Sequence, residues 1–253
     1  MKIVVIGGTG LIGSRLVHLL RQRGHEVLPA APSLGIDSVT GQGLAAAMAG
    51  THTVVDVSNS PSFAPADVLA FFEASAAHLA AAEVRAGVKH HVALSVVGAD
   101  RAPDSGYLVA KVAQERIVEA AGVPYSVVRA TQFFEFAMAI AGSASADGTV
   151  QLPSAAMQPI AADDVVAALA DVVEAGPLNG RIDVAGPERV PMNLFVQRAL
   201  DARGDPRPVV VNAQARYFGA TVDDHSLVPL GAARLGRIRL ADWHAQQATM
   251  PAA

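Results

Sequence analysis

Glycines near the start of the chain have the spacing of a phosphate-binding turn. The segment IGGTGLIG (6–13) fits GxGxxG when read from Gly8 and GxxGxxG when read from Gly7. Glycines allow a tight turn close to a pyrophosphate, and the helix that follows offers free N–H groups and a partial positive charge. The turn follows a predicted strand and opens a predicted helix, which is the context that this motif requires. The predicted dinucleotide contacts are Gly7, Gly8, Thr9, Gly10, Leu11, Ile12 and Gly13. The alternative is a tight turn without a ligand.

The end of the second predicted strand indicates which dinucleotide binds. An NAD site usually places Asp or Glu there to bind the ribose diol. Here the segment LPAAPSLG (28–35) has no acid, and the next one is Asp37. Arg15 in the first helical turn and Ser33 are candidates for binding a 2′-phosphate, although Arg15 is equally well explained as a solvated residue. We therefore favour NADP, with NAD as the alternative.

A second candidate group is Tyr107 and Lys111, which stand four residues apart in YLVAK. This spacing places both side chains on one face of a helix. The helix follows a strand whose end carries Ser95. Ligands of parallel α/β sheets bind outside the carboxyl ends of the strands, so Ser95 and the N-terminal part of the Tyr107 helix are expected to border the dinucleotide. The alternative is an aromatic side chain at a helix start, a solvated lysine and a serine bonded to backbone.

Short β-branched runs alternate with helical patterns along most of the chain, which indicates right-handed βαβ units. We therefore predict an α/β fold, a Rossmann-type doubly wound parallel sheet. The predicted strands are 2–7, 25–30, 36–40, 52–58, 90–97, 125–131 and 181–186. The predicted helices are 11–23, 43–49, 65–86, 107–121, 163–175 (with Asp163 or Asp164 as N-cap) and 192–203. The segment from 205 onward contains Pro and Gly at intervals and is not assigned.

Three motifs together resemble the short-chain dehydrogenase/reductase superfamily: GGTGLIG at the start, SVVG after the strand 90–97, and YLVAKVAQE on the next helix. The segments 122–136, 159–169 and 178–188 are similar to its atypical NmrA-like branch. The likeness covers about residues 1–190. It implies an NAD(P)H-dependent oxidoreductase that acts on a carbonyl, a quinone or a related small molecule. Some NmrA-like proteins lack the tyrosine and bind NADP as regulators, so a non-catalytic NADP sensor is the alternative.

The resemblance also implies roles. Tyr107 would be the general acid/base, and Lys111 would lower the pKa of its phenol and bind the nicotinamide ribose. Ser95 would hold the substrate oxygen, although Val96 follows it where much of the superfamily has a second hydroxyl residue. Ser58 and Asn59 would contact the adenosine, and Thr131 would contact the nicotinamide carboxamide. Gln132, Phe133 and Phe134 are expected to meet substrate, with core packing as the alternative for the rings.

Composition limits the other possibilities. The chain has 253 residues, of which 17% are charged, a net charge of −4 and no cysteine. These values favour one α/β domain over residues 1–253, with substrate-covering segments at about 130–160 and 187–253. No basic run suggests nucleic acid, no apolar stretch suggests a membrane span, and the histidines show no metal-ligand pattern. We expect a cytoplasmic protein with a small-molecule substrate, and the sequence leaves a homo-oligomer open.

Overall fold

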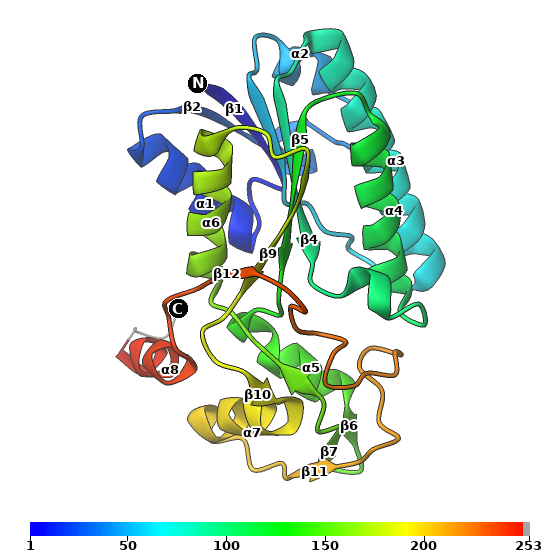
Figure 1. The fold of residues 1–253 in the computed structure, drawn as a ribbon, viewed down its shortest axis with the longest axis vertical. Coiled ribbons are helices and arrows are strands. Elements are labelled where there is room, and N and C mark those ends of the chain that lie inside the picture. Colours follow the sequence, from blue (N-terminus) through cyan, green and yellow to red (C-terminus); the bar gives the residue numbers. More distant parts are fainter. Residues whose placement is uncertain (250–253) are drawn as a thin grey trace.

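A seven-stranded parallel sheet forms the centre of the computed structural model, which describes residues 1–249 (Figure 1). The strand order is β12-β9-β5-β4-β3-β1-β2, and every neighbouring pair is parallel. The strands are β1 (Lys2–Ile6), β2 (Glu26–Ala30), β3 (Thr53–Asp56), β4 (His90–Val96), β5 (Tyr125–Ala130), β9 (Gly180–Ala185) and β12 (Ala233–Leu235). The order of the strands changes direction at β1, because β2 lies on one side of it while β3 and the later strands lie on the other. This is the predicted doubly wound Rossmann-type fold.

Helices cover both faces of the sheet because its central strands carry nearly continuous Ile and Val runs that must be buried on both sides. Figure 1 shows α1 (Leu11–Gln22) and α6 (Ala162–Ala175) on one face, and α3 (Pro65–Ala86) and α4 (Gly106–Ala120) on the other. The short α2 (Leu44–Met48) packs beside α3. The side of the sheet under α1 and α6 holds the largest buried apolar cluster.

Two local predictions were wrong. Residues 36–40 form a turn and not a strand, because the carboxylate of Asp37 accepts from the amides of Val39 and Thr40 and bends the chain. Helix α6 begins at Ala162 after Ala161, so neither Asp163 nor Asp164 is its N-cap. The carboxylate of Asp164 instead accepts from two amides of the C-terminal segment, those of residues 237 and 238.

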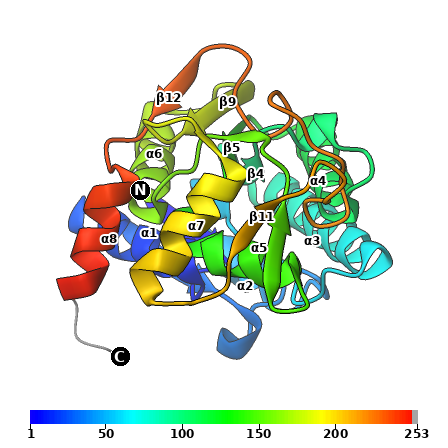
Figure 2. The same ribbon diagram turned by 90° about the horizontal axis from the view of Figure 1, so that it is seen from below.

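A second apolar cluster lies beyond the carboxyl ends of the strands, at the lower end of Figure 1. It is built from two parts of the chain that are far apart in sequence, about 134–161 and 190–243. Figure 2 shows α5, α7 and β11 gathered over this end of the molecule. Its elements are α5 (Ala137–Ser143), β6 (Ser145–Ala146), β7 (Thr149–Leu152), β8 (Ala156–Met157), β10 (Val190–Pro191), α7 (Met192–Arg203), β11 (Val209–Val211) and α8 (Leu240–Thr249). Three short 3-10 helices, Pro32–Leu34, Ala99–Arg101 and Phe134–Phe136, complete the assignment.

No helix within residues 1–249 is long and apolar enough to cross a bilayer. The same residues contain no group of three or more His, Cys, Asp or Glu side chains arranged to hold a metal ion.

Candidate functional site

The glycine turn between β1 and α1 has no room for a side chain at Gly7, Gly8 or Gly13. Gly7 has φ +77°, and a Cβ there would lie 2.9 Å from the backbone of Ser58 at the end of β3. A Cβ on Gly13 would lie 2.1 Å from the carbonyl oxygen of Gly7. Both contacts are with backbone, which cannot move aside as a flexible side chain can. The turn therefore packs α1 closely against β1 and β3, as a pyrophosphate-binding turn requires.

The start of α1 is open to an anion. Gly10 is its N-cap, and the first amides of a helix have no partner within the helix. Thr9, Gly10 and Leu11 are exposed at this point. These amides and the helix dipole fit a phosphate group. The residues predicted at the glycine turn therefore lie together at one exposed helix start.

Arg15 is placed differently from the phosphate-binding role that the sequence suggested. Its guanidinium donates to the carboxylate of Asp163 at 2.8 Å and lies 3.6 Å from that of Glu135. Asp163 belongs to α6, which packs on the side of α1 away from β2, so these ion pairs turn Arg15 away from the end of β2. Ser33 is exposed in the 3-10 turn after β2. Of the two residues, Ser33 is the one that remains near the expected 2′-position.

Tyr107 lies in the first turn of α4, whose N-cap Ser105 accepts from the amide of Leu108. Its ring lies 5.7 Å from that of Phe63 and 6.1 Å from that of Phe72. Its hydroxyl has no hydrogen-bond partner among residues 1–249. Burial raises the pKa of Tyr107 to about 12, so the phenol is neutral at physiological pH. The site therefore presents a neutral proton donor.

Lys111 lies one helical turn after Tyr107 and is only 2% exposed. Its ammonium donates to the carbonyl oxygen of Leu94 in β4 at 2.8 Å and to the side-chain oxygen of Gln114. The same nitrogen lies 4.2 Å from the centre of the Phe72 ring. Burial lowers the pKa of Lys111 to about 8, although the carboxylates of Asp56 and Glu115 oppose the shift. Tyr107 and Lys111 thus share one helix face and the ring of Phe72.

Sequence reasoning missed the partners of Lys111. Gln114 is 1% exposed and donates through its amide nitrogen to Asp56 at 2.7 Å. Asp56 is buried at the end of β3, where it also accepts from the amide and the hydroxyl of Ser58 at 3.0 and 2.6 Å. The signal for Gln114 was its position three residues after Lys111 in the same helix. Asp56 carries no such local signal, because it lies 58 residues earlier in the chain.

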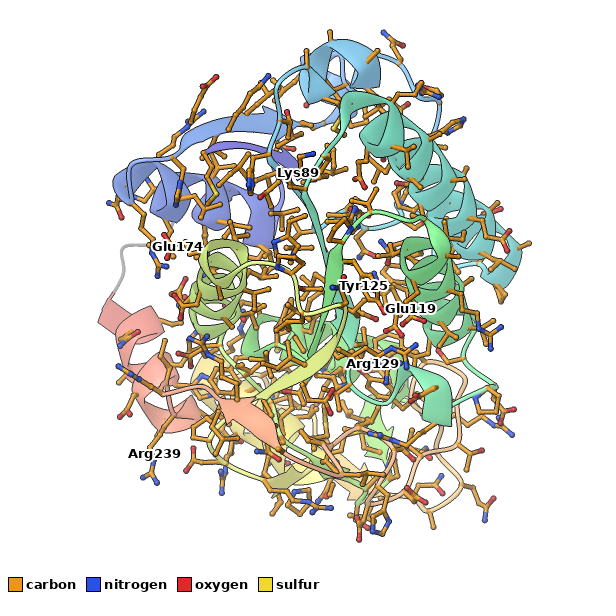
Figure 3. The ribbon with its side chains drawn as sticks, turned by 45° about the horizontal axis from the view of Figure 1, so that its top comes forward. Lys89, Glu119, Tyr125, Arg129, Glu174 and Arg239 are labelled. Carbon is orange, nitrogen blue, oxygen red and sulfur yellow. The ribbon has the colours of Figure 1, made fainter. Side chains whose placement is uncertain are left out.

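Ser95 is not directed at an open site. It is 3% exposed, and its hydroxyl donates to the carboxylate of Glu115 at 2.5 Å. Glu115 also receives two hydrogen bonds from the guanidinium of Arg129 in β5, at 2.9 and 2.6 Å. Figure 3 shows Arg129 and Glu119 on the side of the sheet that α4 covers. The hydroxyl of Ser95 is therefore part of an ionic network under α4. The structure gives no support to the contact with substrate that was expected for it.

The other predicted contacts divide into two groups. Ser58 is half-buried and bonded to Asp56, whereas Asn59 is exposed beside it at the end of β3. At the end of β5, the Thr131 hydroxyl donates to the carbonyl of Gln158 at 2.7 Å, while the side-chain oxygen of Gln132 is buried and has no partner among residues 1–249. A buried acceptor without a donor is uncommon, and a ligand is one explanation.

The two neighbouring phenylalanines have different surroundings. Phe134 is 2% exposed and packs in the second cluster, with its ring 5.7 Å from that of Trp243. Phe133 is half-buried and packs against the main cluster, 5.7 Å from the ring of the exposed Phe136. Phe134 is thus packed in the core, which was the alternative for this ring, and it also contributes to the lining of a pocket on the second cluster.

A turn of the C-terminal segment lies beside Tyr107. Ala220 and Val222 belong to the same small apolar cluster as Tyr107, and Arg216 lies 3.8 Å from the carboxylate of Asp104. Tyr217 is half-buried in this turn, and burial together with the nearby phenol of Tyr107 raises the pKa of its own phenol. Its hydroxyl, like that of Tyr107, has no partner within the part of the chain that is described. Residues 216–222 therefore cover the start of α4.

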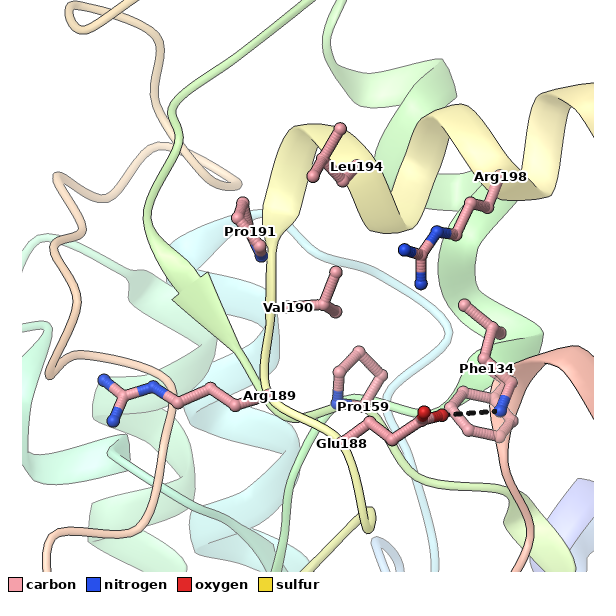
Figure 4. Close-up of a pocket in the computed structure, with 9 residues that line it drawn as sticks. Phe134, Pro159, Glu188, Arg189, Val190, Pro191, Leu194 and Arg198 are labelled. Atoms are coloured by element: carbon pink, nitrogen blue, oxygen red, sulfur yellow. Dashed lines mark hydrogen bonds between the residues drawn. The ribbon is translucent and has the colours of Figure 1, made fainter.

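A pocket lies away from the glycine turn and Tyr107. It has a volume of about 260 Å³ on the second cluster (Figure 4). Its lining residues are Phe134, Pro159, Glu188, Arg189, Val190, Pro191, Leu194, Arg198 and Leu240. It contains neither the glycine turn nor Tyr107, and its polar groups form no arrangement suited to proton transfer. We place the candidate site at the carboxyl ends of the strands and not in this pocket.

Comparison with known proteins agrees with this fold. Residues 3–34 match the sequence model of the NAD dependent epimerase/dehydratase family, which covers the glycine turn and β2. No curated protein matches the chain. The matching model is not that of the NmrA-like branch, so the resemblance to that branch stays a prediction.

Several solved structures resemble the chain along most of its length. A dTDP-4-dehydrorhamnose reductase from Clostridium acetobutylicum is 14% identical over 99% of this chain and 100% of its own, with a TM-score of 0.77. MoeE5, solved with UDP-glucuronic acid and NAD, is 20% identical over 97% of each chain, with a TM-score of 0.74. UDP-glucose 4-epimerase from Thermotoga maritima, solved with UDP-glucose, is 17% identical over 88% of this chain and 90% of its own, with a TM-score of 0.68. At these identities the likeness shows the fold.

Proposed function

We propose that the protein is an NAD(P)H-dependent oxidoreductase that transfers a hydride between a nicotinamide cofactor and a carbonyl, a quinone or a related small molecule. The observation that carries this proposal is the phenol of Tyr107. It lies at the carboxyl edge of a Rossmann-type sheet, its hydroxyl lacks a partner within residues 1–249, and Lys111 follows one helical turn later. A proton donor at this edge suits reduction of a carbonyl.

The residues around the site fit a dinucleotide. The backbone from Gly7 to Gly13 would hold the pyrophosphate, and Ser58 and Asn59 would border the adenosine. The unpartnered side-chain oxygen of Gln132 would accept from an amide at the nicotinamide end, next to Thr131. The bound dinucleotide would supply the hydride.

Tyr107 would supply the proton. Its neutral phenol would donate to the oxygen of a carbonyl as negative charge develops there. Burial raises the pKa of this phenol to about 12, which favours donation over abstraction in the free protein. Lys111 is charged at pH 7 because its pKa is about 8, and its ammonium lies on the same helix face. Lys111 would stabilise the phenolate that remains after proton transfer.

The second cluster and the segment 216–222 would form the substrate-covering part of the protein. They correspond to the predicted segments at about 130–160 and 187–253, and the segment 216–222 lies beside Tyr107. The aromatic neighbours Phe63 and Phe72 make the surroundings of the phenol apolar. An apolar carbonyl compound or quinone fits these surroundings better than a strongly charged substrate.

Sugar-nucleotide chemistry is a second candidate, because structures of similar fold were solved with UDP-sugars. The family match does not decide between the two, since residues 3–34 cover the part that would bind a dinucleotide in either case. A sugar nucleotide would also require groups for its own diphosphate. Near Tyr107 the structure offers Arg216, which lies 3.8 Å from Asp104, and Arg101, which donates to the carbonyl of Val228.

The test uses purified full-length protein with NADPH or NADH and three substrate panels: ketones and aldehydes, quinones, and UDP- and dTDP-sugars. We expect turnover with one of the first two panels that falls at least 100-fold in Tyr107→Phe, because the phenol supplies the proton. Tyr125→Phe is the matched control, because Tyr125 is the first residue of β5 and lies at the edge of the sheet opposite to the carboxyl ends of the strands. Cofactor binding without turnover on any panel would favour an NADP-sensing regulator, and turnover of sugar nucleotides alone would favour an epimerase or dehydratase.

Cofactor choice is tested separately. We propose that NADP is preferred, because the end of β2 carries no acid and the exposed Ser33 lies in the turn that follows it. Ser33→Asp is expected to weaken NADPH binding at least tenfold and to change NADH binding less than threefold, because the new carboxylate repels a 2′-phosphate. Arg15→Met should weaken both cofactors by the same factor. Fluorescence titration of each cofactor with wild type, Ser33→Asp and Arg15→Met gives the six dissociation constants, and a wild-type preference for NADH would contradict the proposal.

A further inference from the structure

Gln114 joins the candidate catalytic lysine to the end of β3. Its side-chain oxygen accepts from the ammonium of Lys111, and its nitrogen donates to the carboxylate of Asp56 at 2.7 Å. The direction of its amide is therefore fixed by a donor on one side and an acceptor on the other. All three side chains are at most 2% exposed, so water does not substitute for any of these contacts.

The contacts of Gln114 continue into the loop that follows β3. The other oxygen of Asp56 accepts from the amide and the hydroxyl of Ser58, so the same carboxylate orders the start of this loop. Gly7 of the glycine turn packs against the backbone of Ser58. The chain of contacts therefore runs from the predicted cofactor loops, through Asp56 and Gln114, to Lys111.

Gln114 is one of the few polar groups that contact the ammonium of Lys111 directly. The charged groups near the ammonium are Asp56 from β3 and Glu115 from its own helix, whereas α3 contributes only the ring of Phe72. Glu115 is engaged by Arg129, with hydrogen bonds of 2.9 and 2.6 Å. The direct acceptors of the ammonium are the carbonyl of Leu94 and the amide oxygen of Gln114. Of these two, only Gln114 is a side chain that mutation can remove.

We propose that Gln114 is a positioning residue, which holds the ammonium of Lys111 toward the nicotinamide end of the site and connects it through Asp56 to the loop that receives the cofactor. The inference rests on the proposed function for the identity of the site, but its direct consequence concerns the ammonium itself. Without Gln114 the buried ammonium loses an acceptor and Asp56 loses a donor. Both losses disfavour the charged lysine.

The test measures the titration of Lys111, which is practical because the chain has three lysines. Lys2 and Lys89 lie at the surface and serve as internal references, and Lys111→Met assigns the remaining signal. In protein labelled with ¹³C at the lysine ε-carbons, we expect Gln114→Met to lower the pKa of Lys111 by at least one unit. Gln114→Glu restores an acceptor and is expected to bring that pKa back to the wild-type value or above it.

A role in packing alone would not give these results, because both substitutions keep the length of the side chain while only one keeps the acceptor. Gln197→Met is the matched control. Gln197 lies in α7, and its amide also donates to an aspartate, Asp201, and accepts from a backbone amide, that of Val209 in β11. This control should leave Lys111 unchanged. Circular dichroism and thermal unfolding check that every variant folds. If Gln114→Met does not fold, Gln114→Asn, which is too short to reach both partners, takes its place.

The kcat of the enzyme and its binding of NADPH are measured next. We expect Gln114→Met to lower kcat at least tenfold and to weaken NADPH binding, and Gln114→Glu to recover part of both. An unchanged pKa of Lys111 in a folded Gln114→Met protein would overturn the inference even if turnover depends on Tyr107. A lowered pKa in a protein without turnover would uphold the link between Gln114 and Lys111 while the proposed function fails.

Discussion

The hydroxyl of Ser95 donates to the carboxylate of Glu115 at 2.5 Å, and this bond joins it to the second half of α4, whereas Tyr107 lies in the first turn of that helix. Glu115 lies eight residues after Tyr107 in α4, which is about 12 Å along the helix axis. Ser95 is 3% exposed in the interior on this side of the sheet. The serine at the end of β4 therefore belongs to the structural network of α4.

This placement predicts a mild effect of Ser95→Ala on activity. The change removes one hydrogen bond from a carboxylate that keeps its two bonds to Arg129, so we expect a loss of about 1 kcal/mol in the free energy of unfolding. We expect kcat/KM to change less than threefold, while Tyr107→Phe removes activity. Steady-state kinetics and urea unfolding measure the two quantities. A loss of activity in Ser95→Ala that approaches that of Tyr107→Phe would show that the serine holds substrate.

The pair of Glu115 and Arg129 predicts a large effect on stability. Glu115 is fully buried, so Arg129→Met leaves a carboxylate without its main partner, and we expect a loss of about 3 kcal/mol. The double change of Glu115→Leu with Arg129→Met is expected to recover most of that loss. Urea unfolding of the single and double variants gives the coupling between the two residues.

A control for this pair is the bridge between Arg234 and Asp171 at the surface. Arg234 is 38% exposed and lies 2.5 Å from Asp171, so Arg234→Met is expected to cost less than about 1 kcal/mol. Equal losses for Arg129→Met and Arg234→Met would contradict the importance that we assign to burial.

Local patterns in the sequence were sufficient for six of the seven strands of the sheet and for the helices that cover it. The run PADVLAFFEASAAHLAAAEVRA has Pro at its start and Gly87 after its end, and α3 spans Pro65–Ala86 as predicted. The glycine turn was found in the same way, because its spacing and its position between β1 and α1 are local properties. The apolar run of β4 and the YLVAK helix likewise fixed the place of Tyr107.

Contacts between distant residues could not be predicted from the sequence. The partners Gln114 and Asp56 are 58 residues apart, and no spacing rule links a helix residue to a strand end. The same limit applies to Arg15, whose partner Asp163 is 148 residues away. The three-residue strand β12 is too short for a periodic signal, and it pairs with β9 only once the C-terminal segment has returned to the sheet.

The buried ammonium of Lys111 predicts a pH dependence of stability. The pKa of Lys111 is lowered to about 8, whereas an unfolded lysine titrates near 10.5. Between these values the unfolded chain binds more protons, so the free energy of unfolding rises with pH. Relative to Lys111→Met, the wild-type protein is expected to gain about 2 kcal/mol between pH 8 and pH 10.

Tyr107 acts in the opposite direction at higher pH. Its pKa is raised to about 12 from an ordinary value of 10, so the folded protein keeps a proton that the unfolded chain releases. Stability is therefore lost as the pH rises from 10 towards 12. Urea unfolding of wild type, Lys111→Met and Tyr107→Phe at several pH values separates the two effects. If the free energy of unfolding changed with pH in the same way in wild type and in Lys111→Met, Lys111 would titrate as an ordinary lysine.

The turn at residues 217–220 holds a phenylalanine in a strained backbone. Tyr217 and Ala220 exchange two backbone hydrogen bonds of 2.9 Å, and the two residues between them have φ of +43° for Phe218 and +85° for Gly219. This geometry is that of a two-residue hairpin turn, in which Asn-Gly is preferred and a bulky first residue is an outlier. Phe218 is 44% exposed, and its ring lies 4.9 Å from that of Tyr217.

A strained, exposed aromatic residue beside Tyr217 is better explained by a ligand contact than by folding. We therefore expect Phe218→Asn to keep or raise the melting temperature, because Asn tolerates a positive φ, and to raise KM for an apolar substrate at least fivefold without changing NADPH binding. Thermal unfolding, steady-state kinetics and cofactor titration measure the three quantities. Leu230→Asn, which alters another exposed apolar residue of the C-terminal segment, is the control. A lower melting temperature with an unchanged KM would mean that the Phe218 ring serves the fold alone.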